Sequence, residues 1–218
     1  MPDRTVESRV DSEEHSSAQQ IRRAATRLFA RHGFDGTSLQ RIAEEAGMSK
    51  PTLLYHYASK EALRSAVLGN LIAHFREAVP QLLQAVTSGQ GRFEALLREL
   101  VHFFREDPDR ARLVMRELMD RPAEMQRLML DNLRPWVLLV AEYVRKGQQT
   151  GEVRPEVDPE SYVLHMVTLT IATLGSLPLT SRALSGEVSD ARASERHLRE
   201  LSRLARVSLF TERPESAS

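Results

Sequence analysis

The chain has 218 residues, of which 41% are hydrophobic, and its 30 basic residues balance its 30 acidic ones. The absence of cysteine excludes a disulfide framework and thiolate catalysis, and it suits a protein of the reducing cytoplasm. This length accommodates one large helical domain or a small module followed by a larger one, and the balanced charge alone gives no indication of a nucleic-acid partner.

The first residues carry neither a regular hydrophobic pattern nor the apolar stretch of a signal peptide. We therefore predict a disordered tail over residues 1–15, in which acidic residues outnumber basic ones. The first helix follows, because apolar residues recur at helical spacing from Ile21 to Phe29, and Gly33 is expected to end it.

Two short helices joined by a tight turn come next in the chain. Thr37 is predicted to cap the first of them in a capping box with Gln40, and Gly47 to allow the left-handed turn that ends it. Ser49 is predicted to cap the second, with Pro51 in its first turn. Because neither helix is long enough to be stable alone, we predict a helix-turn-helix packed on the preceding helix.

The segment 18–65 is locally basic, with eight cations and four anions. An ordinary solvated helix surface would also explain this excess, so charge alone does not decide for DNA. The residue types favour DNA, since Thr52 can contact a base edge, whereas Tyr55 and His56 are suited to phosphate. Hydroxyl groups at helix N-termini and two lysines are suited to hold the phosphate backbone. The predicted DNA-binding residues are Thr37, Ser38, Ser49, Lys50, Thr52, Tyr55, His56 and Lys60.

The sequence around these residues resembles the DNA-binding domain of the TetR family of transcriptional regulators. The resemblance rests on the segment AATRLFARHGFDGTSLQRIAEEAGMSKPTLLYHYASKEAL, which meets nearly every fixed position of the family pattern. It implies an all-α fold of about nine helices, in which a three-helix helix-turn-helix domain precedes a larger helical domain for ligand binding and dimerisation. It also implies a ligand-responsive regulator that binds a double-stranded, palindromic DNA operator as a homodimer, most simply a repressor and otherwise an activator.

Some positions depart from the family pattern. Pro51 stands where glycine is common, which removes a backbone N–H that could bind phosphate. Leu54 stands where tyrosine is usual, which removes an expected phosphate contact and leaves more of the positioning to its neighbours. Tyr57 replaces phenylalanine and is a conservative change. These departures leave the predicted fold unchanged but bear on how the protein holds DNA.

The remainder of the chain also has helical periodicity. A stripe over residues 93–104 predicts one helix, and prolines at first-turn positions predict further helices that begin at Pro108 and Pro159. A long helix is predicted over residues 122–147. The β-branched run 167–173 would also suit a buried strand, but because the sequence offers no second strand to pair with it, a helix is predicted. The domain boundaries are then 16–63 for the helix-turn-helix domain and 64–211 for the larger one, with 212–218 as a second disordered tail.

The apolar run 162–179 is interrupted by polar residues and a proline, unlike the roughly 20 predominantly apolar residues of a membrane span, so no membrane partner is predicted. It is nevertheless apolar on too many sides for one core to cover. We therefore expect a homodimer through helices near 158–179 and 195–211, the segments that form a four-helix bundle in the TetR family. Two half-sites would then lie about 34–36 Å apart, or a multiple of that distance.

A small lipophilic effector is expected in the core of the larger domain, although the sequence does not identify it. Methionines in the middle of the chain adapt to irregular ligands, although core packing is the simpler explanation for them. Aromatic residues and one histidine are suited to line a pocket between helices. The candidates are Phe104, Met115, Met119, Met129, Trp136, Tyr143 and His165.

No catalytic constellation is present. The sequence lacks the nucleophile elbow, the zinc-protease motif, the dinucleotide fingerprint and the P-loop, and its seven histidines lack metal-ligand spacing. We therefore predict no enzyme, no cofactor and no metal site. A helical adaptor without a small-molecule ligand is the remaining alternative, but it would not need hydroxyl, lysine and aromatic residues together on one exposed helix.

Overall fold

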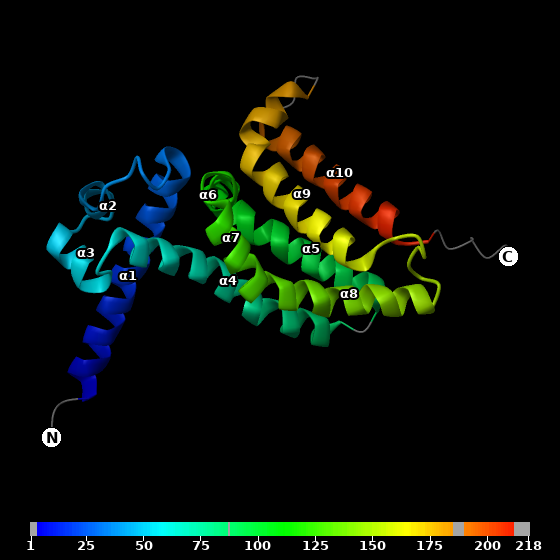
Figure 1. Ribbon diagram of the computed structural model, residues 1–218, viewed down its shortest axis with the longest axis horizontal. Coiled ribbons are helices and arrows are strands. Elements are labelled where there is room, and N and C mark those ends of the chain that lie inside the picture. The colour runs from blue at the N-terminus through cyan, green and yellow to red at the C-terminus, as the bar shows by residue number, and fades with distance from the viewer. Residues whose placement is uncertain (1–3, 87, 185–189, 212–218) are drawn as a thin grey trace. The chain divides into compact units, whose positions relative to one another are not determined.

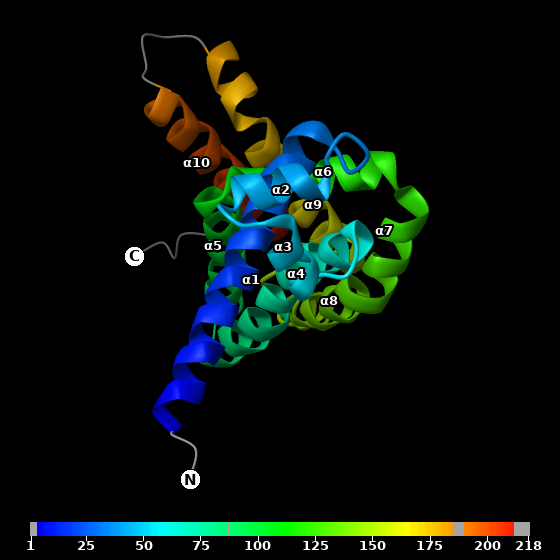
Figure 2. The same ribbon diagram turned by 90° about the vertical axis from the view of Figure 1, so that its left-hand side faces the viewer.

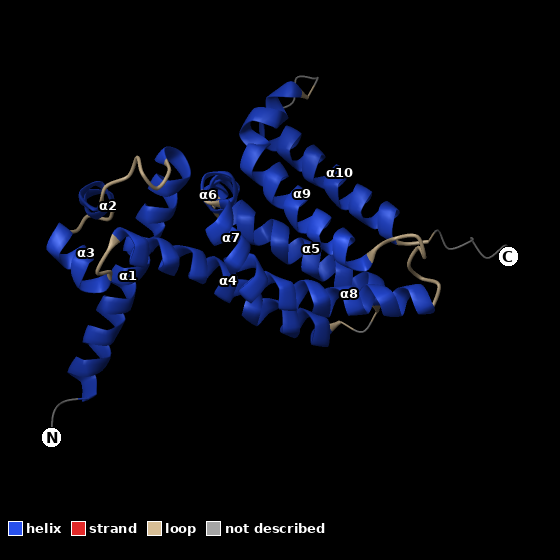
Figure 3. Cartoon of the chain, in the orientation of Figure 1, coloured by secondary structure: helices blue, strands red, loops and turns tan. Residues whose placement is uncertain are grey.

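The computed structural model describes residues 4–86, 88–184 and 190–211. Within these ranges the chain consists of helices and loops and contains no strand, which confirms the all-α fold (Figures 1 and 3). The described residues form nine helices when α7, the π turn after it and α8 are taken as one continuous helix. The chain divides into two compact units, Met1–Ala73 and His74–Ser218, and helix α4 contributes to both.

The first unit contains α1 (Arg4–His32), α2 (Leu39–Glu45), α3 (Lys50–His56) and the first half of α4 (Lys60–Ala85). The core of this unit combines the apolar stripe of α1 with one apolar face of each short helix. Burial of these faces stabilises α2 and α3, which have seven residues each and are too short to be stable alone. The buried residues include Ile21, Ala24, Ala25, Leu28, Phe29, Ile42, Ala43, Leu53 and Leu63.

The prediction of a disordered tail over residues 1–15 is wrong from Arg4 onward, because helix α1 begins there. The helix extends that far because each residue added to an existing helix gains one hydrogen bond, and neither glycine nor proline interrupts residues 4–15. The predicted C-terminal tail, 212–218, lies outside the described residues.

The second unit contains the rest of α4 and the helices that follow it. Asp107 and Asp158 cap α6 and α9 through their carboxylates, and a proline follows each of them, as predicted. Hydrogen bonds from Ser161 lower the pKa of Asp158, so this cap stays ionised in weakly acidic solution. The helices of this unit are α5 (Gly89–Glu106), α6 (Pro108–Asp120), α7 (Pro122–Leu128), α8 (Arg134–Gln149), α9 (Pro159–Thr180) and α10 (Asp190–Leu209).

The long helix predicted over 122–147 exists, but it contains a π turn over Met129–Leu133 between α7 and α8. Pro135 accounts for the irregularity, because it has no N–H to donate to the carbonyl one turn earlier. The turn widens instead, and the N–H of Arg134 donates to the carbonyl of Met129.

Helices α9 and α10 lie side by side in both views (Figures 1 and 2), and the loop before α9 is tied to the end of α10. Val153 of the loop forms an isolated β-bridge with Phe210. The hydroxyl of Tyr162 on α9 donates to the carbonyl of Ala205 on α10. Burial raises the pKa of Tyr162, so its phenol remains a hydrogen-bond donor at neutral pH. The cluster of Val144, Val153, Tyr162 and Leu209 forms the core at this end of the unit.

Candidate nucleic-acid interface

The turn between α2 and α3 has the predicted geometry. Gly47 adopts a φ of 68°, a conformation in which other residues are strained, and it ends α2. The hydroxyl of Ser49 caps α3 by accepting from the N–H of Thr52 at 3.2 Å, and Pro51 occupies the first turn. The predictions for Gly47, Ser49 and Pro51 are therefore confirmed.

The prediction that Thr37 caps α2 is wrong, because the cap is Ser38, one residue later. The hydroxyl of Ser38 accepts from the N–H of Arg41 at 3.2 Å. Thr37 is only 2% exposed, and its hydroxyl donates to the carbonyls of Gly33 at 2.8 Å and Leu28 at 3.3 Å. The Thr37 side chain therefore holds the end of α1 to the loop and does not face solvent, whereas Ser38 does.

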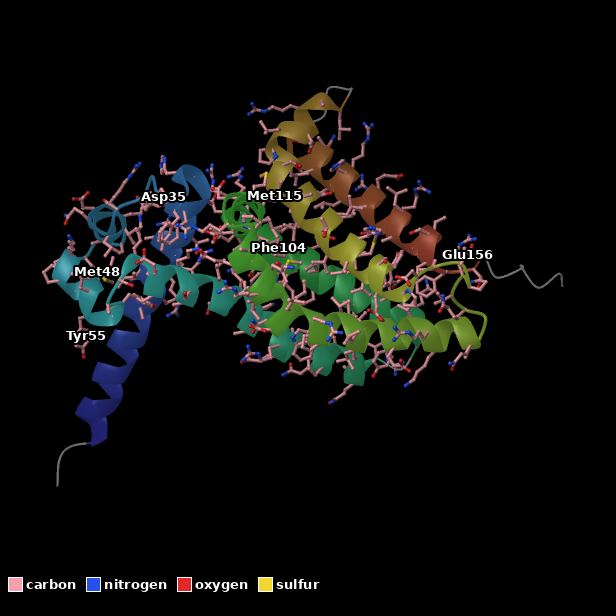
Figure 4. The ribbon with its side chains drawn as sticks, viewed as in Figure 1. Asp35, Met48, Tyr55, Phe104, Met115 and Glu156 are labelled. Carbon is pink, nitrogen blue, oxygen red and sulfur yellow. The ribbon has the colours of Figure 1, made fainter. Side chains whose placement is uncertain are left out.

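Helix α3 has one buried side and one exposed side. Leu53 is fully buried and fixes the helix in the unit. Lys50 and Thr52 are exposed, and Tyr55 is 73% exposed on the outer side of the helix, as Figure 4 shows. His56 is half-buried, with its ring 5.3 Å from that of Tyr55. The helix thus presents a cation, a hydroxyl and a phenol together.

Two further contacts shape this surface. The hydroxyls of Ser49 and Thr52 share a hydrogen bond of 2.7 Å, which fixes both at the start of α3. Lys50 is exposed and forms no ion pair within the described residues, whereas Arg27 is held by Glu45 at 3.0 Å. Lys50 is therefore the cation of α3 that is available to an anionic partner.

The hydroxyl of Tyr57, which a phenylalanine would lack, forms two hydrogen bonds. It accepts from Arg22 Nη1 at 2.9 Å and donates to the carbonyl of Ala18 at 3.4 Å. Both partners lie on α1, so the phenol connects the end of α3 to the first helix. Sequence spacing gave no signal for this contact, because the residues it joins are 35 and 39 positions apart.

Lys60 was predicted to contact the DNA backbone, but the structure gives its ammonium group two other partners. It donates to the carbonyls of Phe34 at 2.8 Å and Thr37 at 2.9 Å, and it lies 4.2 Å from the centre of the Phe34 ring. An ammonium group has three N–H donors, so one is left for any further partner. The geometry therefore gives Lys60 mainly a structural role.

Replacing Lys60 by methionine is expected to destabilise the protein by about 1–2 kcal/mol, because two carbonyls lose a charged donor. The midpoint of thermal or urea unfolding measures this change. Lys50→Met is the matched control, since Lys50 is exposed without an ion pair in the described residues and its loss should leave the midpoint within experimental error. Equal midpoints for the two variants would contradict the structural role of Lys60.

The predicted effector residues separate into two groups. Phe104 is buried and Met115 is half-buried in the second unit, where Figure 4 labels both. Met129, Trp136 and Tyr143 of the same unit are also half-buried. Met119 is 73% exposed near the end of α6, and His165 is exposed on α9. These two do not lie in the interior, because they were selected by residue type and not by the face of the helix that carries them. The described residues also contain no group of three or more histidine, aspartate or glutamate side chains placed to hold a metal ion.

Comparison with known families decides the class of this chain. Residues 21–67 match the family model for bacterial regulatory proteins of the tetR family, and residues 91–204, more than half of the chain, match the tetracyclin repressor-like C-terminal domain. The chain belongs to the TetR family. The first match covers the helix-turn-helix, and the second covers most of α5 to α10.

Individual relatives of this TetR-family chain agree with that assignment. The transcriptional repressor AcnR of Corynebacterium diphtheriae is 26% identical over 153 residues, which are 70% of this chain and 75% of AcnR. In three other curated relatives, the part that aligns with this chain covers 61%, 42% and 45% of the length of the relative. A tetR-family regulatory protein from Rhodococcus RHA1 has the same fold, with a TM-score of 0.70 at 21% identity over 90% of this chain and 98% of that one. AibR, solved with isovaleryl coenzyme A and operator DNA, gives a TM-score of 0.62 at 21% identity over 84% of this chain and 96% of AibR.

Proposed function

We propose that this TetR-family chain is a cytoplasmic, ligand-responsive transcriptional regulator that binds a palindromic operator as a homodimer. The observation that carries the proposal is the exposed side of α3, where Lys50, Thr52 and Tyr55 face outward from a helix fixed by buried Leu53. A short helix docked in this way presents its side chains to the major groove of DNA. Repression is the simpler mode, and the name of AcnR supports it, while activation would use the same DNA-binding unit.

The residues of this surface have different roles in the proposed complex. Lys50 neutralises a phosphate, and Thr52 contacts a base edge. Tyr55 and His56 position the helix on the backbone together with the hydroxyls of Ser38 and Ser49. Thr37 and Lys60 act indirectly, because they hold the loop between α1 and α2 in place.

The exposed apolar residues of α9 and α10 support a homodimer through this pair of helices. Among the described residues, Pro159–Ala183 has the length and apolar composition to cross a bilayer, a criterion that core helices of soluble proteins also meet. In a dimer the same apolar side chains would pack against a second copy. The large ones that a single chain leaves exposed on α9 and α10 are Leu164, Leu169, Leu179, Leu204 and Val207.

The proposed effector is a small lipophilic molecule held in the second unit near Phe104, Met115, Met129 and Trp136. Aromatic and methionine side chains suit an apolar ligand of irregular shape. Release from DNA requires that the ligand bind two conformations unequally, since equal affinity shifts no equilibrium. The structure of AibR in complex with isovaleryl coenzyme A and operator DNA shows that the same fold accommodates a coenzyme A ester and DNA.

A titration of the purified protein against the promoter DNA beside its own gene tests the DNA-binding part. Lys50→Ala should weaken binding to every sequence and lower the slope of log affinity against log salt by about one. Thr52→Ala should change the preference among operator variants by about threefold to tenfold at one base pair. Arg98→Ala removes an exposed cation on α5, outside the proposed DNA-binding surface and dimer interface, and serves as the control, with wild-type affinity expected.

The absence of a salt-dependent complex up to micromolar protein would contradict the proposed function and favour a helical adaptor. If Lys50→Ala and Thr52→Ala altered binding in the same way, the assigned roles of the two residues would be wrong. A thermal-shift screen with lipophilic compounds and acyl-coenzyme A esters would identify the effector class. A molecule that raises the midpoint should also release the operator.

A further inference from the structure

Helix α4 connects the two units without a break. Its residues up to Ala73 belong to the first unit, and those from His74 onward belong to the second. Contacts made by the second half of α4 therefore act on the same helix that contributes to the first unit. His74 is the first residue of α4 in the second unit, so its contacts help to hold α4 in that unit.

His74 contacts α5 in two ways. Its Nε2 lies 2.7 Å from a carboxylate oxygen of Glu99, and both side chains are partly buried, with 37% and 26% exposure. Its ring also stacks on the ring of Phe103, with centroids 4.3 Å apart and planes inclined by 25°. The adjacent Phe75 packs edge-on against the same Phe103 ring at 4.8 Å. An imidazole thus joins α4 to α5 through one polar and one aromatic contact.

The same phenylalanine is held from α6. Arg110 donates to the carbonyl of Phe103 at 2.7 Å, and its guanidinium group lies 4.3 Å from the centre of the Phe103 ring. Helix α6 in turn contacts α9, where Arg112 donates to the carbonyl of Gly175 at 3.4 Å. The His74 contact is therefore one end of a connected path from α4 through α5 and α6 to α9.

Charged side chains of α5 and α6 reach the surroundings of His74. Glu99 faces it from α5, and Arg110 approaches from α6 through the shared Phe103 ring. Arg110 is balanced by its own neighbours, Glu106 at 3.5 Å and Asp107 at 3.9 Å. On α4 itself, Arg76 is bonded to Asn132 of the π turn. Glu99 is thus the anion in direct contact with the imidazole.

We propose that His74 and Glu99 form a protonation-sensitive contact that positions α4 and thereby sets operator affinity, an inference that rests on the proposed function. Imidazole groups exchange their charge within the physiological pH range. The protonated form makes a charge-assisted hydrogen bond to Glu99 and a cation–π contact with Phe103, whereas the neutral form keeps only an ordinary hydrogen bond. His74 is a positioning residue in this scheme, since it acts on DNA through α4.

The direction of the effect follows from that difference. A weaker contact between α4 and α5 lets α4 adopt orientations in which the two DNA-binding units of a dimer no longer match their half-sites. Operator affinity of the wild type should therefore fall as the pH rises. The contribution of His74 should be about twofold to fivefold, the range expected for a partly exposed ion pair.

The test measures operator affinity by fluorescence anisotropy from pH 5.5 to 8.0 at constant ionic strength for full-length variants. His74→Phe keeps an aromatic ring against Phe103 and removes the bond to Glu99, and Glu99→Gln removes only the charge. Both variants should lose the His74 contribution to the pH profile, and their unfolding midpoints show whether they fold. His102→Phe is the matched control, because His102 pairs with Glu106 at 3.4 Å within α5 and is well exposed.

Any pH dependence that arises within the first unit is common to the wild type and all of these variants. The difference between wild type and His74→Phe therefore isolates one residue. Superimposable pH profiles for wild type, His74→Phe and Glu99→Gln would overturn the inference, as would an equal change in His102→Phe. Failure of the wild type to bind any operator would instead contradict the proposed function, so the two failures are distinguishable.

Discussion

Replacing Leu169 and Leu204 together by glutamate will convert the protein to a monomer and lower operator affinity by at least about 100-fold. The two side chains lie on α9 and α10 and are 41% and 48% exposed in the single chain. In the proposed dimer they are buried against a second copy. The double variant places four carboxylates at that apolar interface, and burial of each carboxylate carries a desolvation penalty.

The loss of DNA binding follows from geometry. One short recognition helix contacts only half of a palindromic site, so a monomer forgoes the second half-site. Sedimentation or light scattering gives the oligomeric state, and anisotropy with a labelled operator gives the affinity. The two measurements should change together across a protein dilution series, because the dimer is the species that binds.

Leu139→Glu is the matched control for this prediction. Leu139 is a similarly exposed leucine, with 37% exposure, but it lies on α8 and outside the proposed interface. The control should remain dimeric and bind the operator normally. A dimer that survives both glutamates, or one that Leu139→Glu disrupts equally, would place the interface elsewhere.

The parts of the fold that could be predicted from sequence depend on contacts between residues close in the chain. Ser49 caps α3 and Gly47 ends α2 because a hydroxyl or a missing side chain acts on backbone groups within a few residues. Thr37 and Ser38 show the limit of that rule. Both are hydroxyl residues in adjacent positions, and burial of the first against Leu28 and Gly33 decides which one caps the helix.

Some residues have roles that could not be predicted from the sequence, because their partners lie more than 20 positions away in the chain. The ammonium of Lys60 bonds to carbonyls 23 and 26 positions away, which no local pattern indicates. His74 and Glu99 are 25 positions apart and were not singled out for the same reason. Met119 and His165 do not lie in the interior, because the type of a residue does not indicate which face of a helix carries its side chain.

Replacing Gly147 by alanine is expected to destabilise the protein by about 1–3 kcal/mol, which would lower the unfolding midpoint by about 3–10 °C. In a helix this substitution normally stabilises by roughly 0.5–1 kcal/mol, because alanine has the higher helix propensity. Here the added methyl group would lie 2.5 Å from Cγ2 and 3.3 Å from Cβ of Val153. Val153 is β-branched and only 4% exposed, so it has little freedom to move away.

A shift of Val153 away from the added methyl group would also disturb the contact between the α8–α9 loop and α10. The N–H of Val153 donates to the carbonyl of Gly147 at 3.0 Å, and the next residue, Arg154, donates to the carbonyl of Leu209 at 3.0 Å. Gly69→Ala in α4 is the control, since an added methyl group there meets no atom within 4 Å and should stabilise the protein. Val153→Ala should cost less in the Gly147→Ala background than in the wild type, because it removes the clashing atom. If both glycine variants raised the midpoint, the close approach of Val153 to α8 would not restrict position 147, and helix propensity alone would govern both sites.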